Sequence, residues 1–266
     1  MTLKNKLILS VIIPCYKQEK TIVRDLQRIK NVLEKIRYDY EIICVVDGKT
    51  DKTYTQAKEL ASAKLKVVGY QYNRGKGYAL RFGFAKAQGQ LIAFIDAGMD
   101  IAPEGLPMLL EHMLWYKSDA IVGSIRHSAS LIKNYPIKRK ILSWGYHFLT
   151  KSLFGLRITD SQRGIKIFKR KVLEKVLPRL LVKQYAIDIE LLAVAARVGY
   201  TKIHDGPVAM DASKMQYSSI TLGTIWNMLW DTLAVFYRLK ILHYYDDSNK
   251  RKWRYDPELN FKINIG

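Results

Sequence analysis

The segment LIAFIDAGMD, residues 91–100, decides the fold class of this chain. It opens with the apolar run Leu91–Ile95 and closes on two carboxylates, Asp96 and Asp100. A short apolar run followed at once by acidic residues is typical of a buried strand that ends at a ligand-binding edge. Two aspartates in a loop are also common turn formers, so their role depends on the surrounding segments.

This segment is part of a repeated pattern. From Leu7 to Val122, short apolar runs alternate with longer amphipathic ones. Such alternation predicts βαβ units with right-handed crossovers, and hence an α/β, Rossmann-like fold with a mostly parallel sheet flanked by helices. The expected strands are Leu7–Ile13, Glu41–Val46, Lys66–Tyr70, Leu91–Ile95 and Ala120–Val122. The expected helices are Thr21–Ile36, Thr53–Ala63, Gly77–Ala87 with Gly89 as its C-cap, and Glu104–Tyr116.

This pattern changes after Ser124. We expect a basic and aromatic helix over Ile137–Phe154, a strand over Ile165–Phe168 and a helix over Ala186–Val198. Residues Tyr217–Tyr245 have a helical period rich in aromatic and basic side chains. A polar tail follows Asp246, and we expect it to be peripheral.

Composition limits the partners. The 266 residues include 44 basic and 24 acidic ones, a net charge of +20, which favours nucleic acid, acidic lipid or a phosphorylated substrate as partner. No helix-turn-helix, zinc or RNA-binding motif is present, so no nucleic acid is expected. Cys15 and Cys44 lie in apolar runs and predict buried thiols rather than a disulfide framework. Because no apolar stretch has the length of a membrane span and no signal peptide precedes the first strand, we expect a cytoplasmic protein.

Four polar segments follow the expected strands and should converge at one sheet edge: Pro14–Glu19, Asp47–Asp51, Asn73–Gly77 and Asp96–Asp100. Tyr16 could stack on a base, and Asp47 could accept hydrogen bonds from a base or a ribose. Lys76 stands between two glycines before a helix, an arrangement that suits phosphate. Asp96 and Asp100 offer oxygen ligands for Mg²⁺ or Mn²⁺ held against a diphosphate. Ordinary strand-turn-helix connections are the competing interpretation.

In these four segments the chain resembles glycosyltransferase family 2, which has the GT-A fold, and the resemblance covers nearly the whole chain. Three later stretches are similar to the polyprenyl-phosphate sugar synthases, the dolichyl-phosphate glucosyltransferases and mannose synthases. They are DSQRGIKIF at residues 160–168, QYAIDIELL at 184–192 and ASK at 212–214.

The resemblance implies roles for particular residues. Pro14, Tyr16 and Asp47 would hold the nucleoside, and Asp96 and Ala97 the diphosphate and metal. Arg126, Arg139 and Lys214 would bind phosphates of donor or acceptor, with Lys76 beside the donor and Asp160 as a catalytic base or acceptor-positioning group. Asp160 could instead cap the turn before the next strand. For Asp188 and Glu190, a structural salt bridge competes with a direct role.

Three departures from the family pattern matter. Gly98 stands where the second carboxylate of the usual Asp-X-Asp is found, which leaves Asp100 as an inferred substitute. Lys17 and Gln18 replace the usual Asn-Glu, so that Glu19 is displaced by one position. Val46 replaces the first aspartate of the usual Asp-Asp pair.

The function implied is inverting transfer of a hexose from a nucleotide sugar to a polyprenyl phosphate, with UDP-glucose the leading donor and GDP-mannose a possible one.

We expect a GT-A domain at residues 1–214, with a nucleotide-sugar half at 1–123 and an acceptor half at 124–214. An amphipathic helical, membrane-proximal segment and tail would occupy 215–266. Its aromatic and basic side chains suit peripheral attachment to an anionic membrane on the cytoplasmic face, although core packing explains the same aromatics.

Other functions compatible with the sequence are transfer to a saccharide or protein acceptor, and a non-catalytic basic membrane- or nucleic-acid-binding protein on a degenerate transferase fold. A membrane-protein partner could supply the spans that many relatives have.

Overall fold

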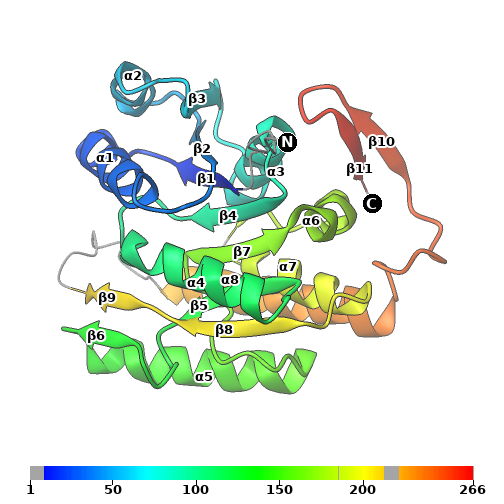
Figure 1. Cartoon of the computed structure of the whole chain (residues 1–266). Coiled ribbons are helices and arrows are strands. Elements are labelled where there is room, and N and C mark those ends of the chain that lie inside the picture. Colours follow the sequence, from blue (N-terminus) through cyan, green and yellow to red (C-terminus); the bar gives the residue numbers. More distant parts are fainter. Residues whose placement is uncertain (1–8, 185, 213–221, 266) are drawn as a thin grey trace, which may run out of the picture.

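A seven-stranded sheet runs through the computed structural model, which describes residues 9–184, 186–212 and 222–265 (Figure 1). The strand order is β3-β2-β1-β4-β7-β5-β8. These strands are β1 (Leu9–Cys15), β2 (Tyr40–Asp47), β3 (Leu65–Tyr70), β4 (Leu91–Ile95), β5 (Ala120–Ser124), β7 (Ile165–Lys169) and β8 (Ile203–Pro207). Each expected strand is present, with ends that differ by a few residues.

The sheet is mostly parallel, as the alternating pattern predicts. Strand β1 pairs in parallel with β2 and β4, β2 with β3, and β5 with β8. Strand β7 is the exception, because it runs antiparallel between β4 and β5. The turn before β7 therefore lies at the edge where β4 ends.

Helices cover both faces of the sheet. One core contains the buried side of α1 (Ile22–Leu33) and α4 (Leu106–Trp115), and α2 (Thr53–Glu59) adds Ala57. The other core contains α3 (Lys76–Lys86), α6 (Arg170–Val176) and α7 (Ile187–Arg197). Alternate residues of β1 and β2 enter the two cores, as expected for strands buried on both faces. Short 3-10 turns, η1 (Pro103–Gly105) and η2 (Leu177–Arg179), adjoin α4 and α6.

Two long amphipathic helices lie beyond these layers. Helix α5 (Ile137–Phe154) has the expected bounds, and α8 (Leu222–Phe236) continues into the π-helical turn η4 (Tyr237–Ile241). The first part of the expected run Tyr217–Tyr245 lies outside the described residues. A small parallel sheet of β6 (Leu131–Lys133) and β9 (Ala209–Asp211) adjoins the edge near α5 (Figure 1). Within the described residues, no helix is both long and apolar enough to cross a bilayer.

Gly89 does not cap a helix, so that prediction was wrong. Helix α3 ends at Lys86, and the capping position Ala87 has an extended backbone. The Gly89 amide instead donates to Ser10 Oγ over 2.8 Å, and a Cβ at this position would lie 2.7 Å from the Ser10 amide nitrogen. Gly89 is required by the close approach of the loop to β1 rather than by helix termination.

The final residues form a hairpin, which the expectation of a peripheral polar tail missed. Strands β10 (Trp253–Asp256) and β11 (Phe261–Asn264) pair in antiparallel fashion beside α3 and α6 (Figure 1). Leu259 in the connecting turn is fully buried. Glu258 accepts a hydrogen bond from Arg74 Nη1 over 2.6 Å and another from the Tyr78 hydroxyl, so the hairpin reaches the loop before α3.

Both cysteines are free and buried, as predicted. Their sulfur atoms lie 3.6 Å apart between β1 and β2.

Candidate active site

The carboxyl ends of β1 to β4 carry the predicted polar segments. Beyond β1, Pro14 is half-buried and Tyr16 is 41% exposed, so the Tyr16 ring is available for stacking. Glu19 accepts a hydrogen bond from the Lys52 amide over 3.1 Å, which ties the segment after β1 to the one after β2. These contacts fit a nucleoside-binding edge, and the individual roles of Pro14, Tyr16 and Glu19 stay predictions.

Asp47 organises the loop that follows β3. Its carboxylate is buried and accepts hydrogen bonds from the Tyr70 hydroxyl, the Asn73 amide side chain and the backbone amides of Arg74 and Gly75, over 2.7 to 3.0 Å. Both carboxylate oxygens therefore have partners within the protein. A direct contact of Asp47 with a nucleoside stays a prediction, and the observed bonds assign it a positioning role.

Asp96 follows β4 directly and faces the turn before β7. Its amide donates to the Gly164 carbonyl over 2.9 Å. A Cβ at position 164 would lie 2.5 Å from Asp96 Oδ2, so only glycine allows this approach. The glycine in DSQRGIKIF is thus explained by the position of the Asp96 carboxylate.

The turn after Asp96 accounts for the missing second carboxylate. Gly98 has a φ of 93° and Met99 a φ of 56°, and a side chain at position 98 would be strained at that backbone angle. The Gly98 amide donates to the buried Asp25 over 3.2 Å. Asp100 returns to the site and lines a cavity of about 370 Å³ together with Asp96. Burial and then the Asp96 charge raise the pKa of Asp100.

Lys76 stands at the start of α3 and joins two aspartates. Its Nζ lies 2.9 Å from Asp96 Oδ1 and 3.0 Å from Asp188 Oδ2. Lys166 of β7 contacts the other oxygen of Asp188 over 2.9 Å. Asp188 therefore makes the structural ion pairs that competed with a direct role in the sequence interpretation.

Glu190 has a different structural role. It is fully buried and accepts hydrogen bonds from the Leu181 and Val182 amides and from the Tyr245 hydroxyl. It holds the loop at residues 181–182 against the protein interior and does not line the Asp96 cavity.

A cluster of guanidinium groups lies on the other side of the Asp96 cavity. Asp160 is buried, contacts Arg163 Nε over 2.8 Å and Arg126 Nη1 over 3.6 Å, and accepts the Gln162 amide over 3.2 Å. The last bond is the turn cap that one interpretation predicted. Arg126 also donates to the Ser143 side chain and carbonyl. Asp160 thus orients two arginines, and a role as base stays a prediction.

A largely apolar groove of about 1260 Å³ opens beside this cluster, between α5 and α8. Arg163 and Gln162 line both the groove and the Asp96 cavity, so the two spaces share a wall. Arg139 and Tyr135 line the groove near its polar wall. The remaining lining residues are Ile141, Leu142, Ser143, Gly145, Tyr146, Leu149, Ile225, Met228 and Leu229.

Sequence reasoning missed most of the groove. Tyr135 and Tyr146 carry no motif that distinguishes them, and Met228 and Leu229 could be read as core residues of an amphipathic helix. Gln162 lies within DSQRGIKIF, but that motif does not indicate a place beside an apolar groove. The apolar period of α5 and α8 was the available signal, but it does not say which helix faces which. Lys214, which the resemblance places among the phosphate ligands, lies outside the described residues.

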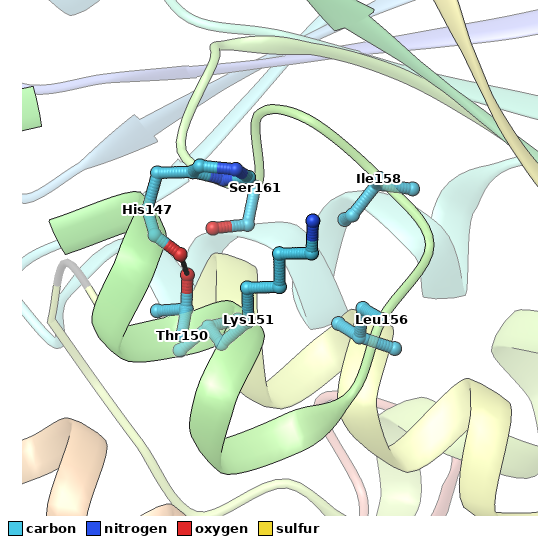
Figure 2. A pocket seen from close by; sticks show the side chains of 7 residues that line it. His147, Thr150, Lys151, Leu156, Ile158 and Ser161 are labelled. Atoms are coloured by element: carbon cyan, nitrogen blue, oxygen red, sulfur yellow. Dashed lines mark hydrogen bonds between the residues drawn. The ribbon is translucent and has the colours of Figure 1, made fainter. Parts of the chain in front are cut away.

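A third, small pocket lies under the end of α5 (Figure 2). Figure 2 shows the Lys151 side chain pointing toward Ser161 and Ile158, with the His147 ring close by. Burial, followed by the charges of Arg126 and Lys151, lowers the pKa of His147. None of the predicted site residues lines this pocket, so the candidate site is the cavity at Asp96.

The donor atoms at Asp96 and Asp100 fit a hard divalent cation. Both side chains line one cavity and supply carboxylate oxygens, the ligands that Mg²⁺ and Mn²⁺ prefer. Across the described ranges, no group of three or more acidic, histidine or cysteine side chains could hold an ion. The protein would therefore supply few ligands and leave the others to phosphate oxygens and water, as Mg²⁺ sites commonly do.

Asp188 predicts an acid-sensitive contribution to stability. Burial alone would raise the pKa of Asp188, but Lys166 and Lys76 outweigh it, so the pKa falls below the ordinary 3.8. A carboxyl group with a lowered folded-state pKa stabilises the protein fully above its unfolded pKa and loses that contribution as the pH falls through the folded value. Asp188→Asn should cost about 3 kcal/mol of unfolding free energy at pH 7.

Urea unfolding at pH 7 and at pH 3 checks this prediction. The difference in unfolding free energy between wild type and Asp188→Asn should be smaller at pH 3 than at pH 7. Glu59→Gln, at an exposed position of α2, should have little effect on the unfolding free energy at either pH. An equal difference at both pH values would contradict the assignment of Asp188.

Comparisons with known proteins agree with this geometry. The sequence profile described as Glycosyl transferase family 2 matches residues 10–177. Dolichyl-phosphate beta-glucosyltransferase of Homo sapiens is 30% identical over 249 residues, which cover 88% of this chain and 76% of that protein. UDP-N-acetylglucosamine–dolichyl-phosphate N-acetylglucosaminyltransferase of Methanococcus voltae is 29% identical and covers 88% of this chain and 96% of its own length.

A solved structure confirms the fold. Glucosyl-3-phosphoglycerate synthase of Mycobacterium tuberculosis, crystallised with Mn²⁺, UDP-glucose and phosphoglyceric acid, superposes with a TM-score of 0.66 at 19% identity, covering 97% of this chain and 86% of that one. With the matched profile and the relatives at this identity, the chain belongs to glycosyl transferase family 2.

Proposed function

We propose that this protein transfers glucose from UDP-glucose to a polyprenyl phosphate, with inversion at the anomeric carbon. The observation that carries the proposal is the shared wall between the apolar groove and the Asp96 cavity. A polyprenyl phosphate needs an apolar channel that ends at cationic groups, and the groove ends at Arg163 and Arg139. The names of the human and Methanococcus voltae relatives indicate the same acceptor class.

The donor would lie along the carboxyl ends of β1 to β4. Tyr16 would stack on the base, and the loop that Asp47 organises would hold the nucleoside and phosphates. Asp96 and Asp100 would hold Mg²⁺ or Mn²⁺, which offsets charge on the leaving diphosphate when bound. The Mn²⁺ and UDP-glucose in the Mycobacterium tuberculosis structure support a donor of this kind.

The acceptor needs little help from a base. A phosphate monoester has a second pKa of about 6 and is already a nucleophilic anion near neutral pH. Its difficulty is repulsion from the donor diphosphate. Arg163, Arg126 and Arg139 would reduce that repulsion, and Asp160 would keep the first two oriented through the contacts described above. We therefore favour a positioning role for Asp160 over a role as base.

Attachment to an anionic membrane surface would give the groove access to its lipid. Helix α5 exposes Ile137, Ile141, Trp144 and Phe148 at helical spacing, and α8 exposes Trp226 and Trp230. Exposed lysines at positions 133, 138 and 140 add positive charge beside the apolar side chains of α5. Such a surface is typical of a helix that lies in the membrane interface.

A transfer assay tests the proposed reaction. Purified protein with radiolabelled UDP-glucose and polyprenyl phosphate should give a labelled product that extracts into organic solvent, faster than with GDP-mannose or UDP-N-acetylglucosamine. Asp96→Asn should lower the rate by about a hundredfold or more, because it removes a carboxylate that would hold the divalent cation against the leaving diphosphate. Absence of an extractable product with every donor would refute the lipid acceptor, and a wild-type rate for the variant would refute the role of Asp96.

The groove makes a separate prediction about the acceptor. Leu229→Gln places a polar amide in the apolar wall and should raise the KM for polyprenyl phosphate about tenfold. The KM for UDP-glucose should not change, because Leu229 does not line the Asp96 cavity. Leu114→Gln on the distant helix α4 is the matched control. A change in the UDP-glucose KM alone would place the acceptor elsewhere.

Membrane attachment can be measured with vesicles. The double variant Trp226→Ser with Trp230→Ser should bind vesicles of phosphatidylcholine and phosphatidylglycerol about tenfold or more weakly, because two interfacial anchors are lost. Trp115→Ser, which removes an 82% exposed tryptophan from α4, should bind like wild type. Equal binding by the double variant and wild type in a flotation assay would exclude this face of α8 as the attachment surface.

A further inference from the structure

Four charged side chains from four parts of the chain form a continuous series of ion pairs at the Asp96 cavity, which we call the ladder. Its members, in order, are Asp96, Lys76, Asp188 and Lys166. Lys76 Nζ lies within 3.0 Å of both carboxylate oxygens of Asp96 and 3.0 Å from Asp188 Oδ2. Asp188 Oδ1 lies 2.9 Å from Lys166 Nζ, which also donates to the Arg163 carbonyl. The ladder therefore runs from the turn of the guanidinium cluster to the donor carboxylate.

Burial makes the partners of this ladder interdependent. The side chains of Lys166 and Asp188 are 2% and 8% exposed, and that of Lys76 is 22% exposed. Two cations and two anions balance each other, and a buried charge without a partner would be costly.

The backbone holds Lys76 in place as well. Gly75 has a φ of 88°, and a Cβ there would lie 2.5 Å from the Lys183 carbonyl oxygen. A Cβ at Gly77 would lie 2.5 Å from the carbonyl oxygen of Val182. Glycines on both sides thus let the start of α3 pack directly on the loop at 182–183. This packing fixes the position of the Lys76 backbone, from which its side chain extends.

We propose that Lys76 is a built-in cation of the donor site, positioned by Asp188 and Lys166, which occupies the Asp96 carboxylate until a divalent cation and a diphosphate arrive together. A divalent cation alone must compete with the ammonium for Asp96. When it takes Asp96, Lys76 keeps Asp188 and offers its freed N–H donors to the diphosphate. In the absence of metal, Lys76 keeps its pairs with Asp96 and Asp188 and still contributes positive charge toward the diphosphate.

This inference rests on the proposed nucleotide-sugar donor and deepens it. Gly98 supplies no carboxylate at the second position of an Asp-X-Asp sequence, and the second carboxylate of the cavity comes from Asp100. The ladder accordingly predicts opposite effects on two ligands. Removing the ammonium frees Asp96 for a metal ion, but it takes away a partner of the diphosphate.

Lys76→Met tests the inference in the full-length protein. Mn²⁺ alone, measured by electron paramagnetic resonance of the free ion, should bind about tenfold more tightly to the variant than to wild type. UDP in EDTA, measured by calorimetry, should bind about tenfold more weakly. Lys86→Met, the same substitution at the exposed last residue of α3, should change neither.

Two further variants separate charge from folding. Lys76→Gln keeps a donor for Asp188 and should show both effects in the same directions, even if the methionine variant fails to fold. Asp188→Asn leaves Asp96 as the carboxylate partner of Lys76 and should weaken Mn²⁺ binding, the reverse of Lys76→Met. Thermal melting of each variant establishes that it is folded.

The outcomes are distinct. Tighter Mn²⁺ binding with weaker UDP binding supports the built-in cation. Parallel weakening of both ligands, or unchanged Mn²⁺ binding, in a folded Lys76 variant overturns it. Because the probes are Mn²⁺ and UDP, failure of the lipid acceptor in the transfer assay leaves this test intact.

Discussion

The close approach of Gly164 to Asp96 is the constraint on which the rest of the site depends. Strand β7 is inserted antiparallel between β4 and β5, so the turn that precedes it lies over the end of β4. That turn brings Asp160 and Arg163 to the same edge as Asp96, although more than sixty residues separate them in sequence. A parallel strand at this place would have delivered Asp160 and Arg163 to the opposite edge. Charge complementarity at the site therefore follows from one reversal of strand direction.

Much of the fold could be predicted from local patterns. Leu91–Ile95 and the other apolar runs are strands, because a strand buried on both faces needs unbroken apolar sequence. Parallel order then brings their carboxyl ends together, and this placed Tyr16, Asp47 and Asp96 on one edge. Gly89 was misjudged because a glycine after a helix has two explanations, a cap or a close contact, and only the tertiary neighbour Ser10 distinguishes them.

The electrostatic connections were not predictable from the sequence. Lys76 finds its partners 20 and 112 residues away. Lys166 looks like an ordinary polar position in a strand, yet it is buried on Asp188. Asp47 was expected to face a ligand, but the loop amides and two side chains occupy its oxygens. Residue type indicates which chemistry a side chain can perform. Whether its hydrogen-bonding atoms are still available to a ligand depends on neighbours in the fold, which sequence periodicity does not reveal.

The two sides of the site differ in how they are built. The donor side is a charged network with paired atoms, held by close backbone contacts at Gly75, Gly77 and Gly164. The groove side consists of apolar side chains on two surface helices with few direct contacts to each other. A rigid polar half suits a ligand of fixed shape, and an adaptable apolar half suits a chain whose length and bends vary.

The hairpin of β10 and β11 affects when the loop before α3 can complete its contacts during synthesis. Glu258 pairs with Arg74 across 184 positions, and Arg74 belongs to the loop that precedes Lys76. Proteins are synthesised from the N-terminus, and their early segments begin to fold while later ones are still being made. The loop at 73–77 is synthesised well before Glu258, and it gains this ion pair only after Glu258 has left the ribosome. The segment made early is thus completed by a residue that is synthesised 184 positions later.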